Sequence, residues 1–199
     1  MLAQDFHWYN PARLPSPAQW VTVERVRVKD AVNYIWWLSK TPKPKADNTR
    51  VLREYTQAMK RLIESGQYNR GKRPSGHVVR EGFTTDRGGA IPPNLLAVSN
   101  TGNDRAYLEA CKALGVRPHP ARFAPEIPEF FIRFLTDPGD LVVDPFAGSN
   151  VTGAVAESLD RNWLSIDLDE EYAPRNPGGL NLRGRRGRGS HNPTVARNL

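Results

Sequence analysis

The stretch Asp144–Gly153, which reads DPFAGSNVTG, decides the fold of this chain. The apolar run Leu141–Val143 comes directly before it, and its length and β-branched residues favour a buried parallel strand. The proline of the stretch ends that strand, Gly148 permits a tight reversal, and Ser149 or Asn150 can cap the helix that the following AVAESL predicts. A strand, a glycine turn and a helix in this order form one half of a nucleotide-binding unit.

The charge at this turn indicates which ligand the start of the helix would bind. A pyrophosphate group favours open backbone N–H groups, glycines at G-x-G-x-x-G spacing and no neighbouring anion. This turn has only Gly148 and Gly153, and Asp144 stands at its beginning. An aspartate repels a diphosphate but suits a ligand with a cationic amino group and no phosphate. S-adenosylmethionine is such a ligand.

A second carboxylate follows at the distance that nucleoside binding requires. Residues 163–166, WLSI, predict the next strand, and Asp167 ends it, 19 residues after Gly148. An acidic residue about 20 residues beyond the glycine turn is the usual partner of ribose hydroxyls. A lone aspartate at a loop end is more often simply solvated, so the strand, turn, helix and strand together carry this prediction.

Three segments of the chain together resemble a known family. DPFAGSNVTG resembles the D-P-F-x-G-S-G-T-T cofactor loop of the amino-methyltransferases that act on DNA, which methylate cytosine N4 or adenine N6. His119–Phe123, HPARF, resembles the H-P-A-x-F-P segment that closes over the methionine end of the cofactor in this family. The segment Tyr34–Asn48 is similar to one in the cytosine-N4 branch, and it favours cytosine over adenine. The resemblance covers roughly residues 1–173.

The resemblance implies an α/β fold, an incomplete Rossmann-like S-adenosylmethionine-dependent methyltransferase sheet with an inserted recognition region. It implies S-adenosyl-L-methionine as cofactor and double-stranded DNA as partner. Asn150 and Val151 stand where the family pattern has Gly and Thr, so the turn is less permissive and lacks one hydroxyl. Ala124 stands where the pattern has Pro. The residues expected to bind the cofactor are His119, Pro120, Asp144, Pro145, Phe146, Gly148, Ser149 and Asp167.

The basic charge of the chain, +7 in total, has two sources. Residues 40–80 contain eleven Lys and Arg against three acidic residues, and residues 174–199 contain six against none. The first block alternates its cations with tyrosines and glycines, which suits contact with DNA phosphates. A solvated basic helix over Arg50–Ile63 is the alternative. The residues predicted to contact DNA are Lys43, Lys45, Arg50 and Arg53.

The same reasoning divides the chain into four regions. Residues 1–44 are expected to form the C-terminal part of a catalytic subregion, and residues 45–118 a DNA target-recognition region. Residues 119–173 are expected to bind S-adenosylmethionine. Residues 174–199 predict a basic disordered tail, because they lack aromatic residues and contain few apolar ones. The RGRRGRG run of the tail suits non-specific nucleic-acid binding, although the absence of any selected role is the favoured interpretation.

Outside the central stretch, the periodicity predicts three more strands and one helix. The strands are Leu2–Trp8, Val21–Val28 and Tyr34–Leu38, and the helix is Ala106–Leu114, ended by Gly115. One cysteine and scattered histidines give no zinc pattern. The sequence shows neither a signal-peptide core nor an apolar run of membrane-spanning length, so we expect a cytoplasmic protein without a membrane partner.

One motif of the family does not occur in the sequence. Methylation of a base amine requires a flipped base and acceptors for its N–H groups, which the family supplies from [SD]-P-P-[YFW]. The only Pro-Pro pair here lies in Ile91–Asn94, IPPN. We therefore expect the C-terminal portion of a methyltransferase, inactive by itself. It would be completed by a separate N-terminal methyltransferase fragment, or it would be an inactive remnant that binds DNA or cofactor.

Overall fold

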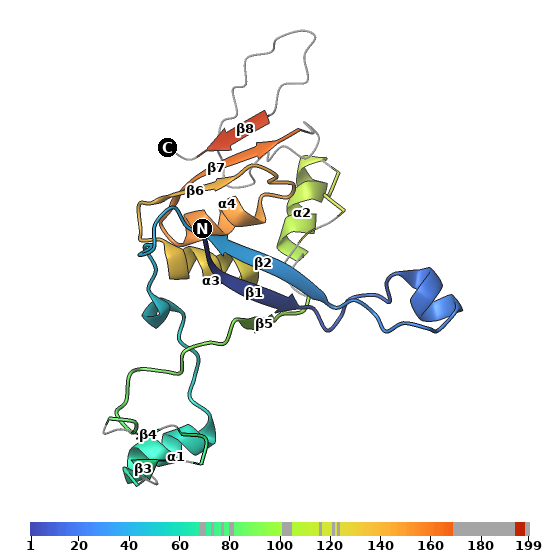
Figure 1. Ribbon diagram of the computed structural model, residues 1–199. Coiled ribbons are helices and arrows are strands. Elements are labelled where there is room, and N and C mark those ends of the chain that lie inside the picture. Colours follow the sequence, from blue (N-terminus) through green and yellow to red (C-terminus); the bar gives the residue numbers. More distant parts are fainter. Residues whose placement is uncertain are drawn as a thin grey trace. The chain divides into compact units, whose positions relative to one another are not determined.

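The computed structural model describes residues 1–67, 71–72, 74–76, 78–79, 82–100, 105–115, 117–120, 122, 124–168 and 194–197 (Figure 1). The chain forms two compact units. The first contains Met1–Ala46 and Asn94–Leu199, and the second contains Asp47–Pro93. The elements expected to bind the cofactor lie in the first unit, whereas most of the basic block lies in the second.

One sheet of the first unit has the strand order β2-β1-β5, and Figure 1 shows these strands side by side. Strand β1, Leu2–Tyr9, is antiparallel to β2, Val32–Leu38, and parallel to β5, Leu95–Ala97. The expected strands Leu2–Trp8 and Tyr34–Leu38 are therefore confirmed. Alternate side chains of β2 point to opposite faces, so that one face is partly buried and the other exposed.

Aromatic side chains attach the inner face of this sheet to helix α3, Glu126–Leu135. Phe6 of β1 is buried, and its ring lies edge-on to Phe131 with the two ring centres 5.1 Å apart. Trp37 of β2 makes a similar edge-on contact with Phe134, also at 5.1 Å. Such contacts add to the free energy gained by burying the rings, so α3 and this sheet form one packed layer pair.

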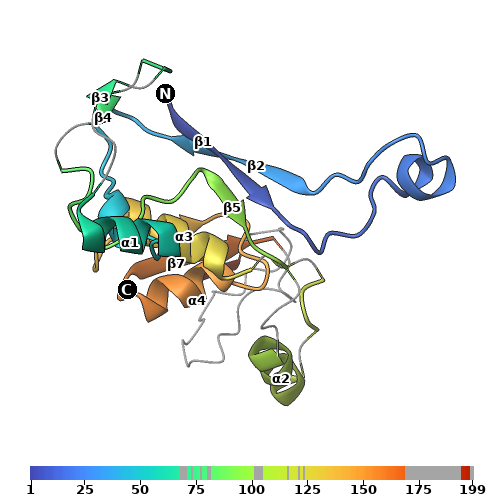
Figure 2. The same cartoon turned by 90° about the horizontal axis from the view of Figure 1, so that it is seen from below.

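The second sheet of the unit contains the stretch that decides the fold. Strand β6, Leu141–Asp144, is parallel to β7, Asn162–Asp167, and helix α4, Val151–Ser158, connects them. Figure 2 shows α3, α4 and β7 lying together. Trp163 of β7 is buried in a cluster with residues of both helices, Ile132 and Ala156. The predicted order of strand, turn, helix and strand is confirmed.

Four expectations about strands, tail and helices need correction. The first is burial of β6, because Leu141 and Val143 are exposed; only one face of this strand packs against α4. The second is the strand at Val21–Val28, where the chain forms a π-helix, η1 (Gln19–Val23), followed by loop. Alternation alone does not produce a strand, because a strand also needs a hydrogen-bonding neighbour, and the described residues provide none here.

The third correction concerns the tail. Strand β8, Thr194–Arg197, pairs antiparallel with β7, within a region expected to be disordered throughout. The edge of β7 offers unpaired backbone groups, which a short segment with β-branched residues can satisfy. The remainder of residues 174–199 lies outside the described residues. Helix α2, Arg105–Leu114, ends at Gly115 with φ +63°, and this agrees with the predicted helix and its stop.

The fourth correction concerns the second unit, where a single basic helix over Arg50–Ile63 was the alternative to a DNA-contacting surface. The chain instead forms a 3₁₀ turn, η2 (Asn48–Val51), and a separate helix, α1 (Gln57–Ser65). Between them the backbone of Arg53 pairs with Ala90, which interrupts helix formation. Strands β3, Gly71–Lys72, and β4, Val78–Val79, pair antiparallel in the same unit. In the described part of the chain, no helix has the length and apolarity needed to cross a membrane.

Candidate functional site

The turn between β6 and α4 is held in shape by hydrogen bonds from its own backbone. Asp144 Oδ1 accepts a hydrogen bond of 3.0 Å from the N–H of Phe146, so the aspartate closes the start of the turn. The N–H of Ala147 donates to the carbonyl of Ile166 in β7, also at 3.0 Å. These two bonds tie the turn to itself and to the neighbouring strand.

The carboxylate of Asp167 makes the third hydrogen bond that holds the turn. Its Oδ2 accepts a 2.7 Å hydrogen bond from the N–H of Gly148, which has φ +50°. The sequence predicted both residues for the same site, and the structure brings them into direct contact. Asp144 and Asp167 lie at the carboxyl ends of two neighbouring parallel strands, the usual place for ligands in α/β folds.

Asn150 explains how the turn forms where the family pattern has Gly. Its φ is +59°, in the left-handed region that favours Gly and tolerates Asn. Its Oδ1 accepts a 2.6 Å hydrogen bond from the hydroxyl of Ser165 on β7, and both side chains are buried. The expectation that a side chain of Ser149 or Asn150 caps α4 is wrong, because Asn150 occupies the capping position but makes no cap hydrogen bond.

Gly153 completes this arrangement. A Cβ atom at Gly153 would lie 2.2 Å from Asn150 Oδ1, so only Gly leaves room for the amide to reach Ser165. Sequence reasoning named Asn150 and Gly153 separately and missed Ser165. The only available signal was an Asn in a position where the family pattern has Gly.

His119, the first residue of the HPARF segment, reaches the same turn from a distant part of the chain. Ala121 and Phe123 of the segment lie outside the described residues. A Cβ atom built on Gly148 would lie 3.2 Å from both Cε1 and Nε2 of His119, so the imidazole ring covers the turn. The N–H of His119 donates to the Tyr107 hydroxyl of α2 at 3.0 Å, and Arg122 donates to the His119 carbonyl. Burial raises the pKa of Tyr107, which keeps its hydroxyl neutral. His119 is thus held as part of a shaped loop.

The remaining predicted cofactor residues lie on the surface of this site. Phe146 is 83% exposed, and Pro145 and Pro120 are also exposed, while Ser149 is partly buried. The structure gathers Asp144, Asp167 and His119 around the Gly148 turn. The cofactor roles of all eight residues stay predictions.

The donor set of the turn fits a ligand without phosphate groups. The N–H groups of Phe146, Ala147, Gly148 and Asn150 all donate to acceptors within the protein. A phosphate site needs such groups to point at the ligand. The two carboxylates instead suit a cationic amino group and hydroxyl groups. Among the described residues, no cluster of His, Cys, Asp and Glu could hold a metal ion.

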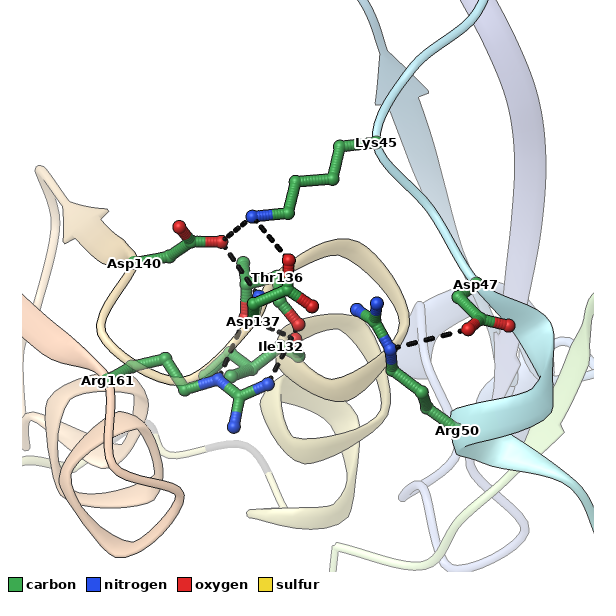
Figure 3. A network of polar contacts seen from close by, with 8 residues as sticks. All are labelled: Lys45, Asp47, Arg50, Ile132, Thr136, Asp137, Asp140 and Arg161. Carbon is green, nitrogen blue, oxygen red and sulfur yellow. Dashed lines mark hydrogen bonds and ion pairs between the residues drawn. The ribbon is translucent and has the colours of Figure 1, made fainter.

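Lys45, predicted to contact DNA, is engaged by two aspartates (Figure 3). Its Nζ lies 2.7 Å from Asp137 Oδ2 and 2.5 Å from Asp140 Oδ2, at the turn between α3 and β6. Hydrogen bonding to Asp137 raises the pKa of Lys45, and hydrogen bonding to Lys45 lowers the pKa of Asp140. The pairing therefore favours the charged forms of Lys45 and Asp140.

Arg161, which directly precedes β7, contacts the same turn (Figure 3). Its guanidinium is buried and donates to the Thr136 hydroxyl at 3.0 Å and to the Thr136 carbonyl at 2.8 Å. A third hydrogen bond, of 2.6 Å, reaches the carbonyl of Leu159. These bonds satisfy carbonyl groups at the ends of α3 and α4, where helices leave acceptors without partners.

The other residues predicted to contact DNA are exposed. Arg50 Nε lies 3.6 Å from Asp47 Oδ2 within the second unit, and Lys43 and Arg53 are exposed as well. A hydrogen bond from Thr49 lowers the pKa of Asp47. The assignment of these residues to DNA contact stays a prediction.

Comparison with known proteins finds one family and several relatives. The sequence model of a family described as DNA methylase matches residues 1–175. Type II methyltransferase M.PvuII of Proteus hauseri is 54% identical over 173 residues, which are 86% of this chain and 52% of that protein. Type II methyltransferase M1.MboII of Moraxella bovis is 29% identical over 130 residues, 63% of this chain and 44% of that protein.

A solved structure agrees with these sequence matches. The PvuII DNA methyltransferase, described as cytosine-N4-specific, superposes with a TM-score of 0.64 and 45% identity over 86% of this chain and 48% of that chain. The expected incomplete Rossmann-like α/β fold is thereby confirmed. The chain spans about half the length of the relatives that it matches.

Proposed function

We propose, since the chain belongs to the DNA amino-methyltransferases and to their cytosine-N4 branch, that it forms the S-adenosylmethionine-binding part of a DNA methyltransferase. The observation that carries this proposal is the gathering of Asp144, Asp167 and His119 around the Gly148 turn. These residues come from two strand ends and a distant loop. Their chemistry fits a nucleoside with an amino group and no phosphate.

Each of the three residues has a proposed role toward the cofactor. Asp144 would attract the cationic amino group, and Asp167 would accept hydrogen bonds from the ribose hydroxyls. A carboxylate accepts up to about four hydrogen bonds, so the bond from Gly148 is compatible with ribose binding. His119 would shape the pocket wall rather than transfer a proton, because its ring packs on the turn.

The proposed substrate is an exocyclic amine of double-stranded DNA, at cytosine N4, with adenine N6 as the alternative. When bound, S-adenosylmethionine supplies the methyl group. The contacts with DNA phosphates are proposed for Lys43, Arg50 and Arg53, with the smallest contribution from Lys45, since two aspartates already pair with it. Their positive charge would also increase the rate of association with DNA.

The sequence has no [SD]-P-P-[YFW] segment, and we propose that methyl transfer requires a polypeptide that carries one. The chain alone should then bind cofactor without methylating DNA. The measurement is transfer of a labelled methyl group to duplex DNA by the pure chain. Reproducible base methylation would contradict this expectation.

Calorimetric titration of the chain with S-adenosylmethionine tests the proposed site. We expect saturable binding that is lost in Asp144→Ala, which removes the carboxylate at the beginning of the turn. The matched control is Glu157→Ala, which removes an exposed carboxylate from α4. No binding by a chain that unfolds cooperatively would refute the proposal and favour an inactive remnant.

A further inference from the structure

The outward side of strand β2 carries a row of large apolar side chains. Tyr34 and Trp36 are 73% and 71% exposed, and Val32 and Leu38 are exposed beside them. The alternate residues of the same strand face α3, where Trp37 packs against Phe134. The sequence therefore places apolar residues on both faces of the strand.

Neighbouring strands extend this row into a continuous surface. Tyr9 of β1 pairs with Val32, and Leu95 of β5 lies beside His7, whose ring packs edge-on against Tyr34 at 5.4 Å. We call this surface the outer face. It consists of the exposed side chains Tyr9, Val32, Tyr34, Trp36, Leu38 and Leu95.

A sheet that faces water on one side normally alternates between apolar and polar residues, whereas α/β sheets have both faces covered. A contiguous exposed apolar surface of several hundred Å² marks an interaction site, and Tyr and Trp are the side chains that most often dominate the affinity of interfaces. One exposed tyrosine or tryptophan can bury about 150–250 Å² when it is covered. The outer face thus has the composition of a protein interface.

The charge of these strands argues for a protein partner over DNA. Strands β1, β2 and β5 contain no Lys or Arg, the residues that contact with DNA phosphates requires. Their charged groups include Asp5, whose Oδ2 lies 3.4 Å from His7 Nε2. Aromatic residues without cations suit the apolar side of a helix or strand.

The extent of the match to relatives indicates which polypeptide docks on the outer face. The matched region is 52% of M.PvuII and 48% of the solved PvuII chain, so about half of each relative lies outside it. We propose that the outer face docks a polypeptide that carries the half of the methylase fold outside this match. The inference rests on the proposed function, because the docked half would also carry the catalytic motif.

Co-expression of this chain with a tagged polypeptide, the part of M.PvuII that the chain does not match, tests the proposal. We expect a one-to-one complex, seen by co-purification and by sedimentation. Trp36→Glu and Tyr34→Lys should each weaken it by about thirtyfold, as expected for a central aromatic anchor. The matched control is Val28→Glu, which places the same charge on a residue that is 89% exposed and outside the sheet, and the complex should persist.

Four results would overturn the proposal. They are a complex that Trp36→Glu leaves unchanged, two soluble polypeptides that do not associate, a tagged partner that stays insoluble despite the chain, and self-association of the chain through the same two aromatic residues. Titration of Trp36→Glu with S-adenosylmethionine separates this proposal from the proposed function. Cofactor binding should persist in that variant. A complex that Trp36→Glu leaves unchanged, formed by a chain that still binds cofactor, would refute only the docking surface.

Discussion

Replacing Gly153 by Ala tests how the DPFAGS turn is held. The new Cβ would lie 2.2 Å from Asn150 Oδ1 and 2.9 Å from its Cγ and Nδ2. Because Asn150 is buried and bonded to the hydroxyl of Ser165, the amide cannot move without losing that hydrogen bond. Steric overpacking costs about 1–3 kcal/mol, and a buried polar group without its partner costs about 1–3 kcal/mol.

Helix propensity opposes these costs, since Ala is favoured over Gly by about 1 kcal/mol inside a helix. The net result should be a free energy of unfolding that is lower by about 1–5 kcal/mol. Urea denaturation, followed by tryptophan fluorescence and by circular dichroism, measures this change. Ala154→Gly, at an exposed position of α4, reports helix propensity alone and should cost about 1 kcal/mol.

The same substitution in an Asn150→Gly background provides the decisive comparison. Asn150→Gly removes the amide that the new methyl group would meet, and Gly suits φ +59°. In that background Gly153→Ala should be neutral or stabilise the protein by up to about 1 kcal/mol. The coupling free energy between the two sites should therefore be at least about 1 kcal/mol. An equal effect of Gly153→Ala in both backgrounds would show that Asn150 does not restrict this position.

Three further predictions concern the polar groups around the α3–β6 turn and the basic segment before the second unit. Lys43→Ala should reduce the salt dependence of DNA binding by about one phosphate contact. Lys45→Ala should change that slope less, because two aspartates already pair with Lys45. DNA affinities measured at several salt concentrations distinguish the two variants. Because the pKa of Asp140 is lowered in the folded protein, its carboxylate stabilises the fold above the ordinary carboxyl pKa of about 3.9. This stabilisation is lost as the pH falls through the pKa of the folded state. In thermal melts, Asp140→Asn should therefore lose less stability in acid than the wild type. Arg161→Met should lower the free energy of unfolding by about 2–4 kcal/mol, because Thr136 loses two hydrogen bonds from a buried guanidinium. Arg161→Lys should recover only part of this loss. Equal stability of the wild type and both variants in urea would contradict this role.

The part of the fold that the sequence predicts is the part set by local chemistry. Strand β6, the turn at Gly148 and helix α4 follow from β-branched residues, a residue suited to positive φ and a run of small apolar side chains. The strand expected at Val21–Val28 does not form. Its alternating pattern is a property of the segment itself, whereas a strand also needs a partner from another part of the chain. A strand exists only where another segment supplies hydrogen bonds, and no short window of sequence contains that information.

The candidate site also has parts that the sequence predicts and parts that it does not. Spacing alone linked Asp167 to Gly148, and the structure places them in contact. The position of His119 beside Gly148 followed from family resemblance and not from any periodicity. Lys45 counted as an available cation in the sequence, because Asp137 and Asp140, its partners, lie more than 90 residues further along the chain.

The departure at Asn150 shows that a change in a family pattern need not be a loss of the site. The family pattern relies on Gly to adopt positive φ, whereas here Asn adopts it at φ +59° and uses its amide to accept from Ser165. This solution requires a hydroxyl on β7 and a residue without a side chain at Gly153, and both are present. The three residues therefore act as one set. Because they fix the beginning of α4 from within, the turn keeps the hydrogen bond of Gly148 to Asp167 without the residue that the family usually places there.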